Sequence, residues 1–389
     1  MLFLSGFFPL PVASGGQHRT MQLLAAFGAR FEVTLLTHAA HAGFETHVPQ
    51  LEAICARVVP VVPVNKRGAW QRLLYKNLFW MRRLASAESS DRFYNAVPNV
   101  NHAIDVELER VRFDVIFCMY WFWHARVFAQ PALKVIDTND VQVERQAHLL
   151  AQSSNVIDRI FAKRLLRAYR RRETDTLRRA DLLVAVTEKD RTQVSRMVGP
   201  DAAIVVTPTG LDTAYFAPQP VEPDLREVVF FGALGNPMNI DAVDFLVHDI
   251  LPRIVRRLPD VRLTLLGASP SPEMRRLAHH DARIRVTGFV EDVRPFLARA
   301  GVVICPLRFA YGIRGRLLEV LSLGVPVVAT PLAVDGMGLS DAAGVERAAD
   351  ASGLADAVVR LLEDPAARAR RAVHRQQHRL HRPSLPGPA

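Results

Sequence analysis

The sequence predicts an α/β fold made of two doubly wound domains in tandem, and three observations lead to this prediction. Short, β-branched apolar runs alternate with longer segments of helical period, which is the pattern of βαβ units around a mostly parallel sheet. The alternation lapses once, in a proline-rich stretch after Thr207, and then restarts. The length of 389 residues fits two domains better than one, because a typical domain has about 150 residues.

The first half, residues 1–210, is expected to be an N-terminal doubly wound domain that begins with a strand and a helix. The expected helix covers residues 17–27. The expected strands, each short and rich in β-branched residues, are 2–5, 31–37, 58–62, 114–119, 133–137, 182–186 and 204–207.

The second half repeats the alternation after an expected linker at residues 211–227. Its expected strands are 228–231, 261–266, 284–287, 302–305 and 325–329, and its expected helices are 239–257, 273–278, 293–300, 314–323 and 353–363. This domain is expected to end near residue 370. Residues 371–389 contain three prolines and no apolar stripe, so they are predicted to be a disordered tail.

Composition excludes several classes of protein. An apolar fraction of 49% with only 23% charged residues excludes wholesale disorder. No apolar run approaches the roughly 18 residues that a membrane-spanning helix needs. The three cysteines form no Cys-x-x-Cys pair, which argues against a disulfide framework or a zinc cluster and favours a reducing, cytoplasmic location. The apolar start, residues 1–8, follows no Lys or Arg and is broken by Ser5 and Gly6, so we expect a core strand rather than a signal peptide.

Ligands of doubly wound sheets bind beyond the carboxyl ends of the strands, and two glycine turns fall at such places. Gly15 and Gly16 lie between the first strand and the first helix, where paired glycines admit a ligand close to the backbone and the helix start presents N–H groups to an anion. A plain tight turn is the alternative, and the dinucleotide pattern Gly-x-Gly-x-x-Gly is absent. The second turn, Gly232 to Asn239, also joins a strand to a helix, and Asn236 or Asn239 there could simply be an N-cap.

Two further groups carry candidate chemistry. Arg316 and Glu319 are three residues apart near the start of an expected helix, so a cation that grips phosphate lies beside a carboxylate that accepts from ribose hydroxyls. An ordinary surface ion pair is the alternative. His124 follows the aromatic run 120–123 and could contact a substrate, although a packed or surface histidine would fit the same sequence.

Several blocks, in order along the chain, resemble the retaining glycosyltransferases of family 4, which have the GT-B fold, and particularly the bacterial exopolysaccharide branch. The resemblance covers residues 2–362. The blocks are Phe8-Pro9 to Gly16-Gln17-His18-Arg19, Arg179-Ala180-Asp181, Thr207 to Asp212, Phe231-Gly232 to Asn239, Gly288-Phe289-Val290, and Pro306-Leu307 to Glu319 with Gly324 to Thr330.

The resemblance implies two Rossmann-like domains that face each other across a cleft, a nucleotide-diphosphate sugar held by the second domain, and a saccharide or lipid-linked acceptor held by the first. Glu319 matches the family's ribose-binding Glu, and Arg316 matches the position of its phosphate-binding Lys. The expected catalytic residues are Arg316, Glu319 and His124. The expected donor-binding residues are Gly15, Gly16, Gly232, Asn236, Asn239, Phe289, Val290, Tyr311, Gly312 and Ile313.

The chain also departs from the family pattern. Tyr311 stands where the first Glu of the family's Glu-x7-Glu motif would be, and the C-terminal helix that returns to the first domain is not recognisable. These departures leave open a degenerate, non-catalytic protein that binds a nucleotide-sugar or acts as a scaffold. A nucleotide-sugar epimerase is a further alternative, but it would need paired acid and base residues that we do not find.

The formal net charge of +10 is clustered. Residues 67–84 interleave Arg and Lys with Trp and Leu, and residues 159–179 contain nine basic residues. The pattern of residues 67–84 favours an amphipathic helix on an anionic membrane surface, so we expect attachment to the cytoplasmic face of the inner membrane. A solvated helix face is the alternative, and nucleic acid is not expected as a partner because no reading motif accompanies the charge. No metal and no cofactor are expected, since the nucleotide-sugar is a substrate.

Overall fold

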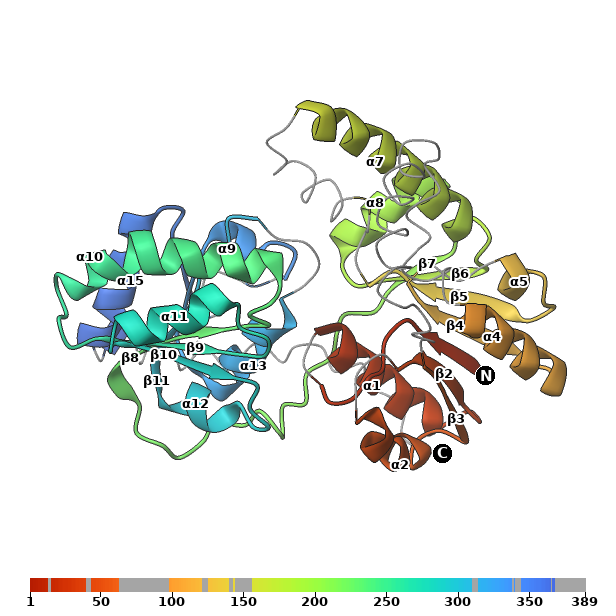
Figure 1. Ribbon diagram of the computed structural model, residues 1–389, viewed down its shortest axis with the longest axis horizontal. Coiled ribbons are helices and arrows are strands. Elements are labelled where there is room, and N and C mark those ends of the chain that lie inside the picture. The colour runs from red at the N-terminus through yellow and green to blue at the C-terminus, as the bar shows by residue number, and fades with distance from the viewer. Residues whose placement is uncertain are drawn as a thin grey trace, which may run out of the picture. The chain divides into compact units, whose positions relative to one another are not determined.

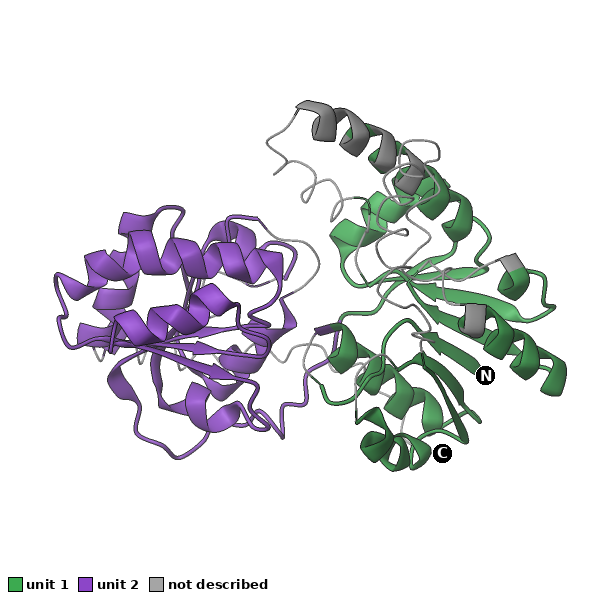
Figure 2. Cartoon of the chain, in the orientation of Figure 1, with its two compact units in different colours: residues 1–12, 16–208 green, residues 13–15, 209–389 purple. Residues whose placement is uncertain are grey.

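The computed structural model describes residues 1–12, 15–39, 43–62, 98–120, 125–139, 143, 156–309, 314–337, 339, 344–364 and 366–367. The chain divides into two compact units (Figure 2). Unit 1 contains Met1–Val12 and Gly16–Pro208, and unit 2 contains Ala13–Gly15 and Thr209–Ala389. Each unit is built around a sheet of its own.

Unit 1 contains a seven-stranded, parallel sheet in the order β3-β2-β1-β4-β5-β6-β7 (Figure 1). Its strands are β1 (Leu2–Ser5), β2 (Thr34–His38), β3 (Arg57–Val61), β4 (Val115–Met119), β5 (Leu133–Asp137), β6 (Leu182–Ala185) and β7 (Ile204–Val206). Its helices are α1 (Gly15–Gly28), η1 (Phe44–His47), α2 (Val48–Glu52), α4 (Pro98–Arg110), α5 (Ala125–Phe128), α7 (Val156–Leu177) and α8 (Glu188–Val198).

The central strands β1 and β4 of unit 1 are nearly continuous apolar runs because both faces of the sheet are covered there. All four residues of β1 are buried, and its alternate side chains enter different cores: Leu2 and Leu4 pack in one, and Phe3 packs in the other. The Phe3 ring stacks on Phe117 of β4, with the ring centroids 5.0 Å apart. This two-sided burial makes short parallel strands recognisable in a sequence.

Unit 2 contains a six-stranded sheet in the order β10-β9-β8-β11-β12-β13, again with parallel neighbours. Its strands are β8 (Asp224–Phe231), β9 (Arg262–Leu266), β10 (Ile284–Gly288), β11 (Ala300–Cys305), β12 (Val327–Ala329) and β13 (Val345–Arg347). Its helices are α9 (Pro237–Phe245), η3 (Leu246–Ile250), α10 (Leu251–Val255), α11 (Pro272–His280), α12 (Arg294–Arg299), α13 (Gly315–Leu323), α14 (Pro331–Val334) and α15 (Ala351–Glu363). One large apolar core fills this unit.

The prediction of an α/β fold with two doubly wound domains is confirmed, and several boundaries differ for identifiable reasons. β8 begins at Asp224, inside the segment predicted as a linker, because Asp224 already pairs with Ala300 of β11. β2 begins at Thr34 rather than at Phe31, whose amide donates to the Phe27 carbonyl in the turn that ends α1.

The helix predicted for residues 239–257 is α9, η3 and α10 in succession, and η3 is a π-helical turn. Pro252 lies in the first turn of α10 and has no backbone N–H to donate. The wider π-helical turn accommodates Pro252, which cannot donate the backbone hydrogen bond that a continuous α-helix requires at its position.

Two predicted features, the amphipathic helix at residues 67–84 and the tail at residues 371–389, lie outside the described residues. Within the described ranges, no helix combines the length and the apolar character needed to span a bilayer.

Candidate functional site

In each sheet the strand order reverses at one point, between β1 and β4 in unit 1 and between β8 and β11 in unit 2. Loops on the two sides of such a point diverge, so a crevice suited to ligands opens beyond the carboxyl ends of those strands. The described candidates after β1, β8 and β11 flank these two points, whereas Phe289 and Val290 follow β10, the outer strand of the unit 2 sheet.

The turn after β8 requires its glycines. The amide of Gly232 donates to the Leu266 carbonyl at the end of β9, with N···O 3.0 Å. A Cβ on Gly232 would lie 2.7 Å from Nδ2 of Asn239, and a Cβ on Gly267 would lie 1.7 Å from the Gly232 carbonyl oxygen. Gly267 also has φ +150°. The backbones of two neighbouring turns therefore pack directly on each other.

Both asparagines of this turn have structural duties. Asn236 is the N-cap of α9, and its side-chain oxygen accepts from the amide of Met238 at 3.1 Å. Asn239 donates from Nδ2 to the Ala233 carbonyl at 2.9 Å and thereby braces the turn. The N-cap alternative is confirmed for Asn236, while contact of either residue with a donor stays a prediction.

Arg316 and Glu319 lie in the first half of α13, and both side chains are partly buried. The guanidinium carbon of Arg316 lies 4.7 Å from the ring centroid of Phe231, the last residue of β8, so a cation–π contact joins the start of α13 to the turn after β8. The neighbouring Arg314 instead donates from Nε to the carbonyl of Ala333 at 2.6 Å.

Burial sets the electrostatics of this pair. Burial raises the pKa of the Glu319 carboxyl, and the charge of Arg316 opposes that rise. Burial likewise lowers the pKa of the Arg316 guanidinium, against the opposing charge of Glu319. Partly desolvated charges interact more strongly with a ligand than solvated ones do. The arrangement thus differs from an exposed surface ion pair.

The segment after β10 exposes one aromatic side chain. Gly288 has φ +73°, a left-handed conformation that favours glycine. The side chain of Phe289 is 51% exposed, while Val290 packs against the core of unit 2. An exposed phenyl ring at the carboxyl edge of a sheet suits stacking against a planar group.

In unit 1 the turn after β1 is fixed by hydroxyl groups. Ser5 and Thr37 both donate from their hydroxyls to the carbonyl of Phe7, at 2.7 and 2.8 Å. A Cβ on Gly16 would lie 3.2 Å from Cζ of Phe7 and 3.3 Å from the hydroxyl of Tyr120, whereas a Cβ on Gly15 would meet nothing within 4 Å. The first position of the Gly-Gly pair is therefore open and the second is enclosed.

A buried ion pair lies beneath this turn. Arg19 of α1 is 2% exposed and Asp137, the last residue of β5, is fully buried. Arg19 donates from Nε to Oδ2 of Asp137 at 2.9 Å and from Nη1 to the Thr207 carbonyl at 2.9 Å. Burial raises the pKa of the Asp137 carboxyl, and Arg19 opposes the rise. This pair was not predicted from the sequence, although an aspartate that ends an apolar strand was a signal for it.

Four predicted site residues, His124, Tyr311, Gly312 and Ile313, lie outside the described residues. Where side chains are described, no group of three or more His, Cys, Asp or Glu residues could hold a metal ion.

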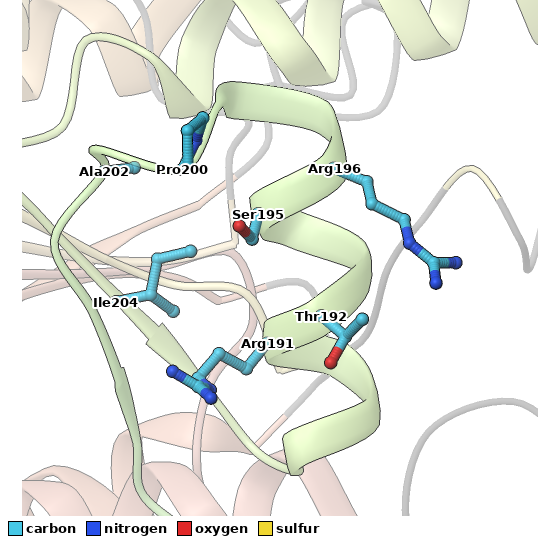
Figure 3. A pocket seen from close by; sticks show the side chains of 7 residues that line it. All are labelled: Arg191, Thr192, Ser195, Arg196, Pro200, Ala202 and Ile204. Atoms are coloured by element: carbon cyan, nitrogen blue, oxygen red, sulfur yellow. The ribbon is translucent and has the colours of Figure 1, made fainter.

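A small hollow of about 260 Å³ lies between α8 and the segment that leads into β7 (Figure 3). Ser195 faces this segment, whereas the side chain of Arg196 points away from it. The hollow is lined by Arg191, Thr192, Ser195, Arg196, Pro200, Ala202 and Ile204. Because β7 is the outer strand of its sheet, the hollow belongs to neither crevice.

The fold and these turns define a class, that of two-unit, doubly wound α/β proteins whose candidate ligand residues lie at the carboxyl edges of the sheets. Residues 14–210 match the family model described as a glycosyl transferase 4-like domain, and residues 226–364 match that of the group 1 glycosyl transferases. The chain belongs to this glycosyltransferase family.

Individual relatives agree with this assignment. The chain is 32% identical over 210 residues to the phosphatidyl-myo-inositol mannosyltransferase of Mycolicibacterium smegmatis, a match that spans 51% of this chain and 52%, about half, of that relative. Among solved structures, Anabaena Alr3699/HepE in complex with UDP and glucose has a TM-score of 0.63 at 15% identity, with 97% of this chain and 93% of that chain covered. WaaG, a glycosyltransferase involved in lipopolysaccharide biosynthesis, has a TM-score of 0.66 at 16% identity, with 98% and 96% covered. These structures establish the GT-B fold.

Proposed function

We propose that the chain transfers a sugar, with retention of configuration, from a nucleotide-diphosphate sugar to a saccharide or lipid-linked acceptor in bacterial surface polysaccharide synthesis. The observation that carries the proposal is the Arg316 and Glu319 pair, held at the carboxyl edge of the unit 2 sheet in a chain that belongs to a glycosyltransferase family. The mannosyltransferase is named for phosphatidyl-myo-inositol and WaaG is described as involved in lipopolysaccharide biosynthesis, and these two lipid-containing molecules support the acceptor class.

The chemistry assigned to each residue follows from its charge. Arg316 stabilises the negative charge that gathers on the departing diphosphate, and partial desolvation strengthens this interaction. Glu319, when ionised, accepts hydrogen bonds from the ribose hydroxyls. Phe289 stacks its exposed ring against the nucleobase of the donor. Tight positioning of the donor and exclusion of water favour transfer over hydrolysis.

Retention is proposed to follow front-face attack. The bond between the anomeric carbon and the diphosphate oxygen breaks while the acceptor oxygen forms its bond to the same carbon on the same face. The leaving phosphate takes the acceptor's proton, so the scheme needs neither a carboxylate nucleophile nor a metal ion. The alternative of a non-catalytic protein that binds a nucleotide-sugar stays open, because Tyr311 stands where the family's Glu-x7-Glu motif has its first Glu.

A thermal-shift screen against UDP-glucose, GDP-mannose and other nucleotide-sugars tests donor binding. Binding to the folded chain alone is expected to stabilise it by about 2.7 kcal/mol at 100 times the dissociation constant. The proposal would be contradicted if no nucleotide-sugar, and neither UDP nor GDP alone, raised the midpoint temperature of thermal unfolding. For a donor that binds, the loss of intact nucleotide-sugar is then measured in the presence of bacterial lipid extract. An active transferase consumes the donor, whereas the non-catalytic alternative binds it and leaves it intact.

We also propose that unit 1 attaches to an anionic membrane surface on the cytoplasmic side. The described part of the basic region supports this idea, because Arg167, Arg170 and Arg171 of α7 are exposed, Arg171 with 86% of its side chain. Each cation near such a surface contributes about 1 kcal/mol, and salt screens the attraction.

Vesicle sedimentation tests the membrane proposal. Replacement of Arg72, Lys76, Arg82 and Arg83 by Gln should release the protein from vesicles that contain phosphatidylglycerol. A matched variant that removes four exposed arginines of unit 2, Arg253, Arg256, Arg276 and Arg283, should stay bound. Binding that does not respond to salt, or no binding by the parent protein, would count against the idea.

A further inference from the structure

The first turn of α13 decides where Arg316 lies, and its own sequence stabilises it poorly. Gly315 and Arg316 are the first two residues of the helix, and Glu319 follows in the second turn. Glycine is among the poorest helix formers, and a helix start lacks the carbonyl groups of a preceding turn. The side chain of Arg314, at the N-cap, makes no capping hydrogen bond to the amides of this turn. The first turn of α13 therefore needs support from outside the helix.

The guanidinium of Arg314 gives this support by binding the end of α14. Its Nε donates to the carbonyl of Ala333 at 2.6 Å, and its Nη2 donates to the carbonyl of Asp335. Ala333 lies in α14, and Asp335 is the residue that ends it. Carbonyl groups at the end of a helix carry partial negative charge, so a cation suits them. Two hydrogen bonds from one planar group fix both the distance and the direction between the two helix ends.

The helix α14 is itself anchored at the carboxyl end of β11. Its N-cap, Thr330, is 5% exposed, and the Thr330 hydroxyl donates to the Leu307 carbonyl at 2.7 Å and accepts from the amide of Ala333 at 3.3 Å. The amide of Thr330 donates to the carbonyl of Cys305, the last residue of β11, at 3.3 Å. Ala333 is fully buried in the core of unit 2. Through α14, Arg314 therefore connects the start of α13 to the sheet.

We propose that Arg314 is a positioning residue for the donor, which holds the first turn of α13 so that Arg316 meets the diphosphate. This inference rests on the proposed function. Arg316 is only two residues from Arg314, and its guanidinium carbon lies 4.7 Å from the ring centroid of Phe231. Loss of the Arg314 bonds lets the first turn fray, and the Arg316 side chain then leaves this place. Two donor nitrogens of Arg314 already bind protein carbonyls, which favours a brace over a direct phosphate ligand.

Calorimetry with UDP and GDP, well below the unfolding temperature, tests this role. Arg314→Met removes both hydrogen bonds and should weaken binding of the nucleotide about five- to tenfold. In Arg314→Gln, the amide nitrogen stands at the same place along the side chain as Nε of arginine, so it still donates to the Ala333 carbonyl. This variant should bind within about threefold of the parent although it has lost the charge. A direct attraction between Arg314 and the diphosphate would instead make both variants equally weak.

A double-mutant cycle with Arg316→Ala tests whether Arg314 acts through Arg316. When Arg316 is already alanine, the further change Arg314→Met should weaken nucleotide binding less than about twofold, because the side chain that it positions is gone. The control is Arg257→Met, which removes a 2.7 Å bond to Asp356 in the same unit. Arg257 lies between α10 and the first residue of β9, at the amino edge of the sheet, so this variant should bind nucleotide like the parent.

Three results would overturn the inference while leaving the proposed function in place. The first is parental nucleotide affinity in Arg314→Met with only a lower unfolding temperature, which is what a purely structural role predicts. The second is a tenfold or greater loss of affinity in Arg314→Gln, a result that decides the question even if Arg314→Met does not fold. The third is a loss from Arg314→Met that persists in full beside Arg316→Ala. Failure of the parent to bind any nucleotide or nucleotide-sugar would instead remove the proposed function and this inference with it.

Discussion

Replacement of Arg19 by methionine is expected to lower the free energy of unfolding of unit 1 by about 3–5 kcal/mol, because it leaves the carboxylate of Asp137 buried without its charged partner. The variant also loses the bond from Arg19 to the Thr207 carbonyl at the end of the sheet. A loss of this size is a large share of the roughly 5–15 kcal/mol that stabilises a typical domain.

Tryptophan fluorescence can follow unit 1 alone, because all four tryptophans, at positions 70, 80, 121 and 123, lie in its sequence. The double variant Arg19→Met/Asp137→Leu should recover most of the lost stability, since an apolar pair needs no charge compensation. The control is Arg191→Met in the same unit, which breaks the 2.7 Å pair between Arg191 and Glu188, two side chains that are 52% and 72% exposed. A surface pair contributes about 0–1 kcal/mol, so this control should unfold almost like the parent.

The effect of Arg19→Met should depend on pH. Without Arg19, burial raises the pKa of Asp137 in the folded state with less opposition. A carboxyl whose folded pKa is higher than its unfolded pKa binds more protons when folded, so the protein loses stability as the pH rises between the two values. The deficit of the single variant should therefore shrink as the pH falls toward about 4, the ordinary value for Asp. A deficit below 1 kcal/mol at pH 7, or one that grows in acid, would contradict the buried-pair description.

The strands other than β13 could be predicted because two-sided burial leaves a local pattern, whereas β13 has only three residues, Val345–Arg347, and was not predicted. β1 and β5 have the predicted boundaries, since each is a short apolar run that ends at a polar residue, Ser5 or Asp137. The helices α7 and α8 were not predicted. α8 is highly charged and buries only Val194 completely, so no apolar stripe marks it in the sequence. The sequence of α7 was likewise noted for its basic residues and not predicted as a helix.

The candidate site divides in the same way. Arg316 and Glu319 are three residues apart, and the N-cap at Asn236 begins a helix that starts with proline, so local rules were enough to single them out. Arg19 and Asp137 are 118 positions apart, and only the folded sheet brings them together. A left-handed asparagine is common enough to anticipate, but a left-handed tyrosine at position 120 results from tertiary contacts and leaves no sign in the sequence.

Arg316→Ala is expected to weaken binding of the nucleotide-diphosphate donor by about 1.5–3 kcal/mol, or roughly 10- to 150-fold, because it removes a charge-assisted contact with the diphosphate. The matched control is Arg308→Ala. Arg308 also lies over an aromatic ring, that of Phe245 at 4.9 Å, and its guanidinium is held by Asp241 on the exposed surface of the same unit. If loss of a stacked arginine merely loosened the unit, both variants would bind the nucleotide less well. The proposal requires that only Arg316→Ala does, as measured by calorimetry with UDP and GDP.

Glu319→Gln should weaken nucleotide binding to a similar degree at pH 7 and should also flatten its pH dependence. Burial raises the pKa of Glu319, so in the parent protein the carboxylate becomes protonated at a higher pH than an ordinary glutamate does. The protonated acid accepts hydrogen bonds from the ribose hydroxyls poorly. The affinity of the parent protein for the nucleotide should therefore fall as the pH is lowered through the raised pKa of Glu319, whereas the Gln variant has no group that titrates there. Glu273→Gln, at an exposed glutamate on α11, controls for removal of one negative charge from unit 2. Equal pH profiles for the parent and Glu319→Gln would mean that Glu319 does not meet the ribose and that its partial burial serves only the packing of α13.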